Sequence, residues 1–428
     1  MLQKINLFLE KNIHFIIFGF FFLQPFLDVF AGINQHFLNL PIEFNVIFRI
    51  LFLLFAIFYL LFLNQTKYKR ISLLYLISIF IYFILYSFTI LYVKDMNVLF
   101  YEFKNMILSF YLPILLLFFF NISKQYSISF SLKYFIYIFA IYILFIAIPN
   151  LFGIAFDSYT QGKIGSSGWF NSANSVSSIL SILFPFLIVY FRKNKSLSIV
   201  FIFFLFLYAI LSMGTKVPIL SLIIIFIINL FYFVILWFKK KQYHRLFLSF
   251  ICTIIIFIST IFIVPKTSFY KNIKIHAEFL GIHSISEVIT NPHYIDRFIF
   301  SDRLTFLNHT KDSYIHSKPI EKFIGIGYIE NYSTDQVSTK MIEIDYFDIF
   351  FRHGIIGFIL YFIPIIILTY NTLRYLNFRF DHINILISII LIYVLALFSG
   401  HIFIVPSTSI FVAFILNIKN FKNNEISV

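Results

Sequence analysis

The sequence predicts an all-α polytopic integral membrane protein with about twelve transmembrane helices. Hydrophobic residues make up 60% of the chain and charged residues only 12%, against about 25% charged residues in typical soluble domains. Apolar stretches of about 20 residues recur along the chain, and a helix of that length crosses a bilayer core of about 30 Å. A helix also satisfies its own backbone hydrogen bonds in lipid.

The predicted spans follow one another from the N-terminus. Lys4 and Lys11 precede the first apolar stretch and no small-residue cleavage site follows it, so we expect a retained helix and not a signal peptide. Cys252 is the single cysteine, which excludes a disulfide framework. The spans are predicted at 14–33, 45–63, 72–93, 105–121, 133–152, 174–191, 197–213, 217–238, 247–265, 349–370, 383–400 and 406–418.

The positive residues predict the orientation of these spans. With a cytoplasmic N-terminus, most Lys and Arg residues of the connections fall on the inner side, and the short outer connections hold only Lys94, Lys104, Lys163 and Lys216. Positive residues in short loops favour the cytoplasm, so both termini are predicted to be cytoplasmic. Topology also explains the net charge of +14, and nucleic acid is not an expected partner.

One long polar connection divides the chain. We expect transmembrane helices 1–9 in residues 1–265, an extracytoplasmic loop in residues 266–348, and transmembrane helices 10–12 in residues 349–428. Long loops without structure are uncommon unless they are functional. Apolar residues at helical spacing predict that this loop is partly helical, at Ile275–Ile289 and Arg303–Ile315.

Three carboxylates, Glu343, Asp345 and Asp348, stand where this loop enters the tenth span. One of the aspartates can be explained as a helix cap or as a first-turn acid. Helix capping does not explain Glu343. Partial burial and mutual repulsion would raise a carboxylate pKa toward that of a general base, so the three are the predicted catalytic residues.

Two cations are predicted to bind phosphate. Lys216 stands in a short outer hairpin, where topology disfavours a positive residue, and Arg303 stands in the long loop. Charge-assisted bonds from such groups suit a lipid diphosphate. The structural alternative for Arg303 is a solvated loop charge paired with Asp302.

Asp28 and Arg49 fall within the first two spans, in the predicted outer third of the bilayer. A neutralising ion pair between them is the favoured interpretation, and a contact with lipid or glycan is the alternative.

The outer stretch around Trp169, Asn171 and Asn174 is either an ordinary hairpin or a place where amides and an aromatic ring hold sugars, and Tyr328 in a predicted turn is a further candidate contact. The outer histidines lack a tight metal-ligand spacing, so neither a metal nor a cofactor is predicted.

Taken in order, these motifs resemble the O-antigen ligase and O-antigen polymerase superfamily, and the segment ending at Asp28 is similar to members from Gram-positive bacteria. The motifs are the stretch Gly168 to Asn174, the hairpin Gly214 to Lys216, Arg303 followed by Gly325 to Tyr328, and Glu343, Asp345 and Asp348 ahead of Gly354 to Gly357.

The resemblance implies a metal-independent, inverting glycosyltransferase of the membrane-embedded C type. Such an enzyme takes a glycan from an undecaprenyl-diphosphate carrier on the outer face of the cell membrane. Members commonly carry a basic residue where Lys216 stands, an arginine where Arg303 stands, and a histidine where this chain has Glu343. Because this chain lacks that histidine, a ligase role is less favoured. Glu343 is then predicted to be the base only because it occupies the same position.

The sequence thus predicts a polymerase for a capsular, exopolysaccharide or O-antigen-like polysaccharide. Its expected partners are the undecaprenyl-diphosphate-linked oligosaccharide and the lipid bilayer, with a flippase and a chain-length regulator as further candidates. Two alternatives remain: a ligase that moves finished polymer to another acceptor, and a flippase or transporter of lipid-linked oligosaccharide. A transporter built from inverted repeats would show similar halves, and no such repeat is evident.

Overall fold

The computed structural model describes residues 2–40, 43–94, 96–158, 164–282, 284–329 and 341–422. In this part of the chain, nine helices are long and apolar enough to cross a membrane, and Leu197–Met213 and Pro406–Leu416 are shorter apolar helices. The prediction of an all-α polytopic membrane protein is therefore confirmed. The main helices are α1 Leu2–Ile33, α2 Phe44–Phe58, α3 Lys69–Val93, α4 Leu99–Ser109, α5 Tyr111–Tyr126, α6 Leu132–Leu151, α7 Ala173–Lys193, α8 Leu197–Met213, α9 Val217–Lys239, α10 Tyr243–Ile263, α16 Asp345–Leu373, α17 Phe380–Phe398 and α18 Pro406–Leu416.

The connection between α10 and α16 is largely helical. It comprises α11 Ser268–Phe279, α12 Ile285–Thr290, α13 Pro292–Tyr294, the π-helix η5 Ile295–Phe300, α14 Arg303–His316 and α15 Pro319–Ile324. The helix predicted at Arg303–Ile315 matches α14. The one predicted at Ile275–Ile289 is wrong in extent, because the chain turns at Gly281, which has a φ of +67°.

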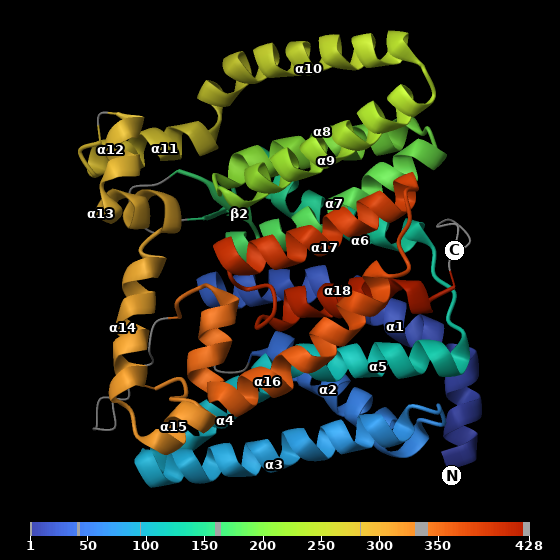
Figure 1. The fold of residues 1–428 in the computed structure, drawn as a ribbon, viewed down its shortest axis with the longest axis vertical. Helices are drawn as coiled ribbons and strands as arrows, with labels where there is room; N and C mark the ends of the chain where they lie inside the picture. Colours follow the sequence, from blue (N-terminus) through green and yellow to red (C-terminus); the bar gives the residue numbers. More distant parts are fainter. Residues whose placement is uncertain are drawn as a thin grey trace.

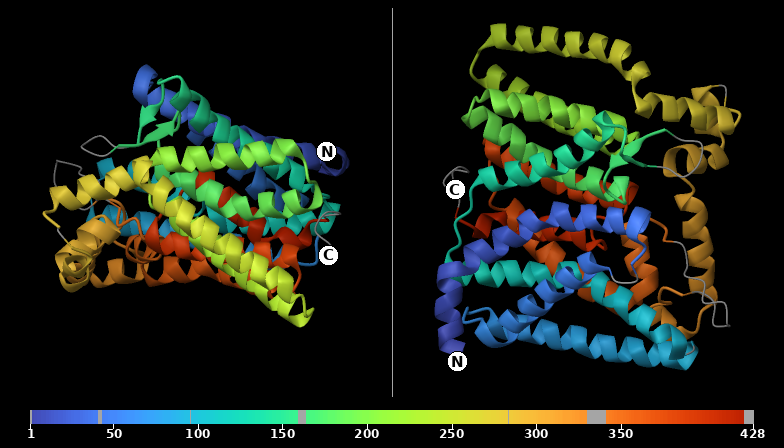
Figure 2. Two further views of the ribbon diagram at one scale, coloured as in Figure 1. Left: turned by 90° about the horizontal axis from the view of Figure 1, so that it is seen from above. Right: turned by 180° about the vertical axis from the view of Figure 1, so that it is seen from behind.

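The spanning helices lie side by side, and the two ends of the bundle differ (Figures 1 and 2). Helices α11 to α14 gather at one end, where α14 runs across the ends of the spanning helices. Both chain termini lie at the opposite end. A two-stranded antiparallel hairpin of β1 Phe156–Asp157 and β2 Ser166–Gly168, with Phe156 opposite Gly168, lies at the α11 end.

The core is formed by α5, α7, α17 and α18. Helix α18 is buried on all sides from Ser407 to Leu416, as expected for a helix that is apolar all round and surrounded by protein. Its 11 residues extend only about 16 Å, so α18 cannot cross a bilayer core of about 30 Å by itself. In contrast, α10 stands at the edge of the bundle next to α9 (Figure 1).

Candidate active site

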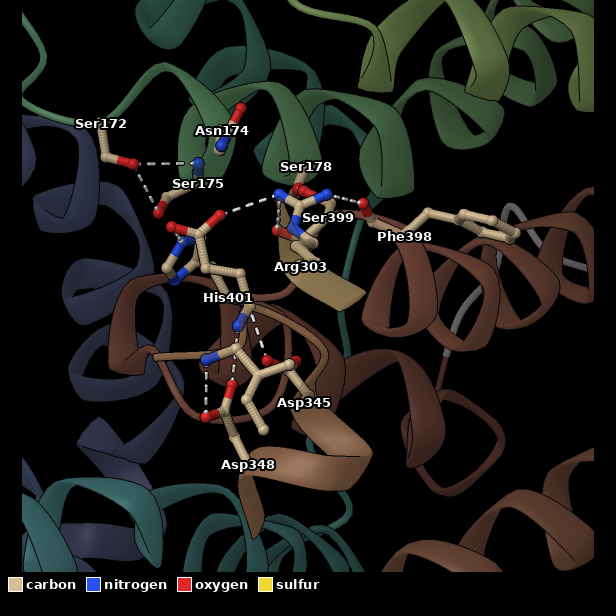
Figure 3. A network of polar contacts seen from close by, with 12 residues as sticks. Ser172, Asn174, Ser175, Ser178, Arg303, Asp345, Asp348, Phe398, Ser399 and His401 are labelled. Atoms are coloured by element: carbon tan, nitrogen blue, oxygen red, sulfur yellow. Dashed lines mark hydrogen bonds and ion pairs between the residues drawn. The ribbon is translucent and has the colours of Figure 1, made fainter. Parts of the chain in front are cut away.

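A cluster of one acid and two basic side chains lies at the α11 to α14 end of the bundle (Figure 3). Arg303 Nη2 donates to Glu343 Oε2 at 2.9 Å and to the Ser399 carbonyl at 3.3 Å, and Nη1 donates to the Phe398 carbonyl. His401 Nε2 lies 3.8 Å from Glu343 Oε1. The Glu343 side chain is 32% exposed and that of Arg303 only 9%, so the carboxylate is the open member of this pair.

The N-terminus of α14 positions Arg303. Asp296 of η5 accepts hydrogen bonds from the backbone amides of Leu304 and Thr305 at 2.8 Å, and from the Thr305 hydroxyl at 2.6 Å. These bonds satisfy amides that an α-helix leaves unpaired at its start. Arg303 is buried, so the alternative of a solvated loop charge is wrong. The partner of Asp302 is Arg297, at 3.3 Å.

Asp348 holds the backbone that carries Glu343. Its carboxylate accepts from the amide of Glu343 at 2.9 Å and from the amide of Ile342 at 3.1 Å, and Arg352 Nε donates to it at 3.3 Å. Glu343 has a φ of +61°, a backbone conformation that costs a non-glycine residue about 1–2 kcal/mol. The hydrogen bonds to Asp348 stabilise this conformation.

Asp345 holds the loop that carries His401 in the same way. Its carboxylate accepts from the amides of His401 and Ile402 at 2.9 Å and of Phe403 at 2.7 Å. His401 also has a positive φ, +62°. The preceding Gly400 has a φ of +62°, and a Cβ there would lie 2.6 Å from the Glu343 carbonyl oxygen. Asp345 and Asp348 are each 1% exposed, so of the three predicted carboxylates only Glu343 is open to a substrate.

The electrostatics of Glu343 are set by its two basic neighbours. Burial raises its pKa, but hydrogen bonding and charge interactions with His401 and Arg303 outweigh burial and lower the pKa from 4.5 to about 2. Burial lowers the pKa of His401, but Glu343 outweighs this effect and holds that pKa above its usual value. The raised pKa that the sequence predicts for a carboxylate of this group is therefore not found at Glu343, because its neighbours in space are basic.

The first turns of α7 face the cluster (Figure 3). The Ser172 hydroxyl caps the helix by accepting from the amide of Ser175 at 3.3 Å. One turn later, the hydroxyls of Ser178 and Ser399 lie 3.3 Å apart, and the Ser399 carbonyl is one of the partners of Arg303. The positive end of the α7 dipole and the Asn174 amide thus lie on the same side as Arg303 and His401.

Comparison with known protein families decides the assignment. The family described as O-antigen ligase like membrane protein matches residues 10–287 and 287–419. The chain belongs to this family. No curated protein and no solved structure matches it. Membership of the O-antigen ligase-like family indicates a membrane glycan ligase or polymerase, a glycosyltransferase-type enzyme that acts on a lipid-linked oligosaccharide.

The other predicted phosphate-binding residue of this O-antigen ligase-like protein, Lys216, contacts the segment that precedes Arg303. It is exposed, donates to the Phe298 carbonyl, and lies 5.2 Å above the Phe298 ring. Phe298 belongs to η5, the segment that leads into Arg303. Lys216 is therefore linked to the element that positions Arg303.

The aromatic and amide candidates differ in accessibility. Trp169 packs on the end of α6, with its ring nitrogen donating to the Ile154 carbonyl at 3.2 Å and its amide to the Phe145 carbonyl at 3.1 Å. Asn171 is exposed, and Asn174 is partly exposed on the first turn of α7. Of these three, Asn174 lies at the cluster (Figure 3).

Asp28 and Arg49 form the internal ion pair that the sequence favours. Arg49 Nη2 donates to Asp28 Oδ1 at 2.5 Å, Arg49 Nε donates to Gln24 at 3.1 Å, and the Tyr142 hydroxyl donates to Asp28 Oδ2 at 2.9 Å. Arg49 is only 4% exposed. Their observed contacts are thus those of a buried ion pair that links α1, α2 and α6.

Tyr328 belongs to a second buried network. Its hydroxyl lies 3.0 Å from His353 Nε2, and its ring lies 4.9 Å from the Arg352 guanidinium. The Glu102 carboxylate accepts from the amides of Tyr328 and Ile329 and pairs with Lys94 Nζ at 2.6 Å. Both members of that ion pair are fully buried. Sequence reasoning missed it, although an acid within an apolar stretch such as Glu102 is by itself a signal of a structural or functional role.

This network holds the turn at Gly325–Tyr328 against a break in α16. Helix α16 is interrupted at Gly354, which has φ +62° and ψ −171°. The carbonyls of Phe351 and Arg352, freed by the break, accept from the amides of Ile326 at 3.0 Å and Gly327 at 3.2 Å. The loop and the first half of α16, which carries Asp345 and Asp348, are thereby joined into one unit.

Sequence reasoning also missed His401 as a site residue. It follows Gly400 directly after the end of α17, and no motif marks it. His401 and Glu343 are far apart in the sequence and come into contact only in the folded chain. Within the described residues, no group of three or more His, Cys, Asp or Glu side chains is placed to hold a metal ion.

Proposed function

We propose that this protein is a polysaccharide polymerase that transfers a glycan from an undecaprenyl-diphosphate carrier to a sugar hydroxyl on the outer face of the cell membrane. The observation that carries the proposal is the cluster of Arg303, Glu343 and His401, in which one open carboxylate lies between two basic side chains. Family membership supports the same class of reaction.

The two basic groups suit the leaving group. The bond between the anomeric carbon and the diphosphate oxygen breaks, and the electron pair leaves with the diphosphate. Arg303 and protonated His401, with the N-terminus of α7 beside them, would stabilise this developing negative charge. Lys216, on the neighbouring hairpin, is proposed as a further cation for the diphosphate.

Glu343 suits the acceptor. The acceptor hydroxyl oxygen attacks the anomeric carbon from the face opposite the diphosphate, which inverts its configuration, and the hydroxyl proton passes to the carboxylate of Glu343. With a pKa of about 2, this carboxylate is ionised but weakly basic in the free protein. When a diphosphate binds Arg303 and His401, the same cations interact less with Glu343, and its pKa rises. Donor binding would thus activate the base.

The arrangement of the chain supports the proposed orientation. The cluster lies at the bundle end that carries α11 to α14, and both termini lie at the other end (Figure 1). Cytoplasmic termini, which the distribution of Lys and Arg favours, therefore correspond to a site on the outer face. A donor on that face must be carried by lipid, because nucleotide sugars are cytoplasmic.

The Glu343→Gln variant tests the proposal. Gln keeps the size of the side chain and removes the base, so we expect loss of long polymer and accumulation of the lipid-linked single repeat unit. The matched control is Asp302→Asn, which neutralises an acid in an exposed ion pair with Arg297. Polymer of normal length and amount in Glu343→Gln would show that Glu343 is not the base. Loss of the lipid-linked unit itself would place the protein at an earlier step.

A further inference from the structure

A groove lined by both polar and apolar side chains lies at the same end of the bundle as the candidate active site. It encloses about 520 Å³ between the end of α6, the β1–β2 hairpin, the end of α8 and the start of α11. This volume is in the range typical of small-ligand sites. The lining side chains include Asn150, Asp157, Ser166, Tyr208, Lys266 and Ser268.

The two charged side chains of the groove are open to a ligand. Asp157 and Lys266 are both exposed, and neither forms an ion pair or a side-chain hydrogen bond with any residue in the described part of the chain. Two other pairs of charged side chains at this end are ion pairs, Arg297 with Asp302 and Lys274 with Glu278. An acid and a base in one groove favour a ligand that offers both acceptors and donors.

The remaining lining has the same mixed character. Asn150 Nδ2 donates to Ser212 at 3.2 Å and to the Ile146 carbonyl at 3.0 Å, which fixes the amide and leaves its carbonyl oxygen as an acceptor. The Tyr208 ring is 39% exposed. Sugar rings carry hydroxyls that donate and accept, and a C–H face that packs on an aromatic ring. A hydrocarbon chain would leave these polar groups without partners.

A short stretch of chain connects the groove to the candidate active site. Ser166 lines the groove, and Ser172 caps α7 at the candidate active site. Six residues of chain separate them, so their Cα atoms lie at most about 22 Å apart. A short oligosaccharide whose terminal sugar reaches Glu343 can therefore extend into the groove.

We propose that this groove is a binding subsite for the acceptor glycan, which holds sugars remote from the reacting hydroxyl. This inference rests on the proposed function, since it assigns part of the acceptor to that active site. Sugars bound there contribute affinity away from the reacting atoms, and they would keep the growing substrate aligned with Glu343.

The test is a binding measurement on the full-length protein in detergent micelles from which phospholipid has been removed. The probe is a set of size-fractionated oligosaccharides, released by mild acid from the lipid-linked glycan of the strain that carries the gene. Affinity is measured by titration calorimetry for the wild type, Asp157→Asn and Lys266→Gln. Lys274→Gln is the matched control, because Lys274 is an exposed α11 lysine outside the groove.

We expect the wild type and the control to bind equally, and each groove variant to bind about tenfold more weakly, a loss of about 1.4 kcal/mol. Absence of binding to the wild type, or equal affinity in the groove variants, would overturn the inference. So would phosphatidylethanolamine that stays bound to the wild type and is lost from the groove variants, since the occupant would then be a lipid headgroup.

Measuring the polymer made by the Arg303→Ala variant distinguishes a failure of this inference from a failure of the proposed function. If Arg303→Ala abolishes polymer while the groove variants bind normally, only the groove assignment fails. If Arg303→Ala makes normal polymer while the groove variants bind weakly, the polymerase mechanism fails and the groove remains a glycan site.

Discussion

The carboxylate of Asp345 accepts a hydrogen bond from the backbone amide of His401 at 2.9 Å, and it also accepts hydrogen bonds from the next two amides of the same loop. His401 is thereby held at a φ of +62°, 3.8 Å from Glu343. An acid that the sequence marks as catalytic thus supports a histidine that the sequence does not mark. Asp348 has the equivalent role for Glu343 itself.

Asp345→Asn tests this supporting role. The amide NH2 group would face backbone donors, so the variant should lose about 1.5–3 kcal/mol of stability, the range for hydrogen bonds to a charged group. The thermal unfolding midpoint in detergent should fall, and polymer should decrease because His401 is no longer held beside Glu343. Asp302→Asn, at an exposed ion pair, should change neither. An unchanged midpoint in Asp345→Asn would argue against the role.

The buried pair of Lys94 and Glu102 should contribute far more to stability than a surface pair. Both side chains are fully buried, and Glu102 also binds the amides of Tyr328 and Ile329. Glu102→Gln leaves a buried ammonium without its counter-ion, which should cost about 3–5 kcal/mol. Glu43→Gln, which breaks a half-exposed pair with Lys104, should cost less than about 1 kcal/mol. Similar thermal shifts in the two variants would contradict this account.

Stability should depend on pH through Glu343 and His401. The pKa of Glu343 is lowered to about 2, so its contribution is present above its unfolded value of about 4.5 and is lost as pH falls toward 2. The pKa of His401 is raised above its usual 6.5, so its contribution is present below pH 6.5 and is lost as pH rises through the folded value.

Unfolding measured across neutral to alkaline pH checks this prediction. The wild type should lose stability as pH rises above 6.5, and His401→Gln should remove that part of the dependence. His293→Gln, at an exposed histidine on α13, should keep it. Identical pH profiles for the wild type and His401→Gln would show that the contact with Glu343 does not stabilise the protein.

Much of the fold could be predicted because a helix that crosses a bilayer needs about 20 consecutive, mostly apolar residues. Most predicted spans coincide with helical structure to within four residues, as 72–93 does with α3 Lys69–Val93. The exceptions are 14–33, because α1 already begins at Leu2, and 105–121, which covers parts of both α4 and α5. The predicted span at 406–418 is wrong. Its apolar composition suggests a membrane-spanning helix, but α18 is short and is surrounded by protein. Apolar composition indicates that a segment is shielded from water, but it does not indicate whether lipid or protein surrounds that segment.

The site could be predicted only in part. The three neighbouring acids and the place of Arg303 in the long polar connection could be identified from the sequence. The pairing of Arg303 with Glu343 joins residues 40 apart, and the contact of Glu343 with His401 also depends on tertiary structure. Sequence could not show which carboxylate has the lowered pKa for the same reason: the charges nearest to Glu343 in space are basic, although its neighbours along the chain are acids.

The most direct test of the central claim is a comparison of lipid-linked glycans in cells that express Arg303→Ala or Arg297→Ala. Both variants remove an arginine from the same polar connection, but Arg303 is buried against Glu343, and Arg297 lies in an exposed pair with Asp302. We predict that Arg303→Ala accumulates single-unit lipid-linked oligosaccharide without polymer, and that Arg297→Ala makes polymer of normal length. Normal polymer in a stably expressed Arg303→Ala protein would contradict the assignment of this cluster as the active site.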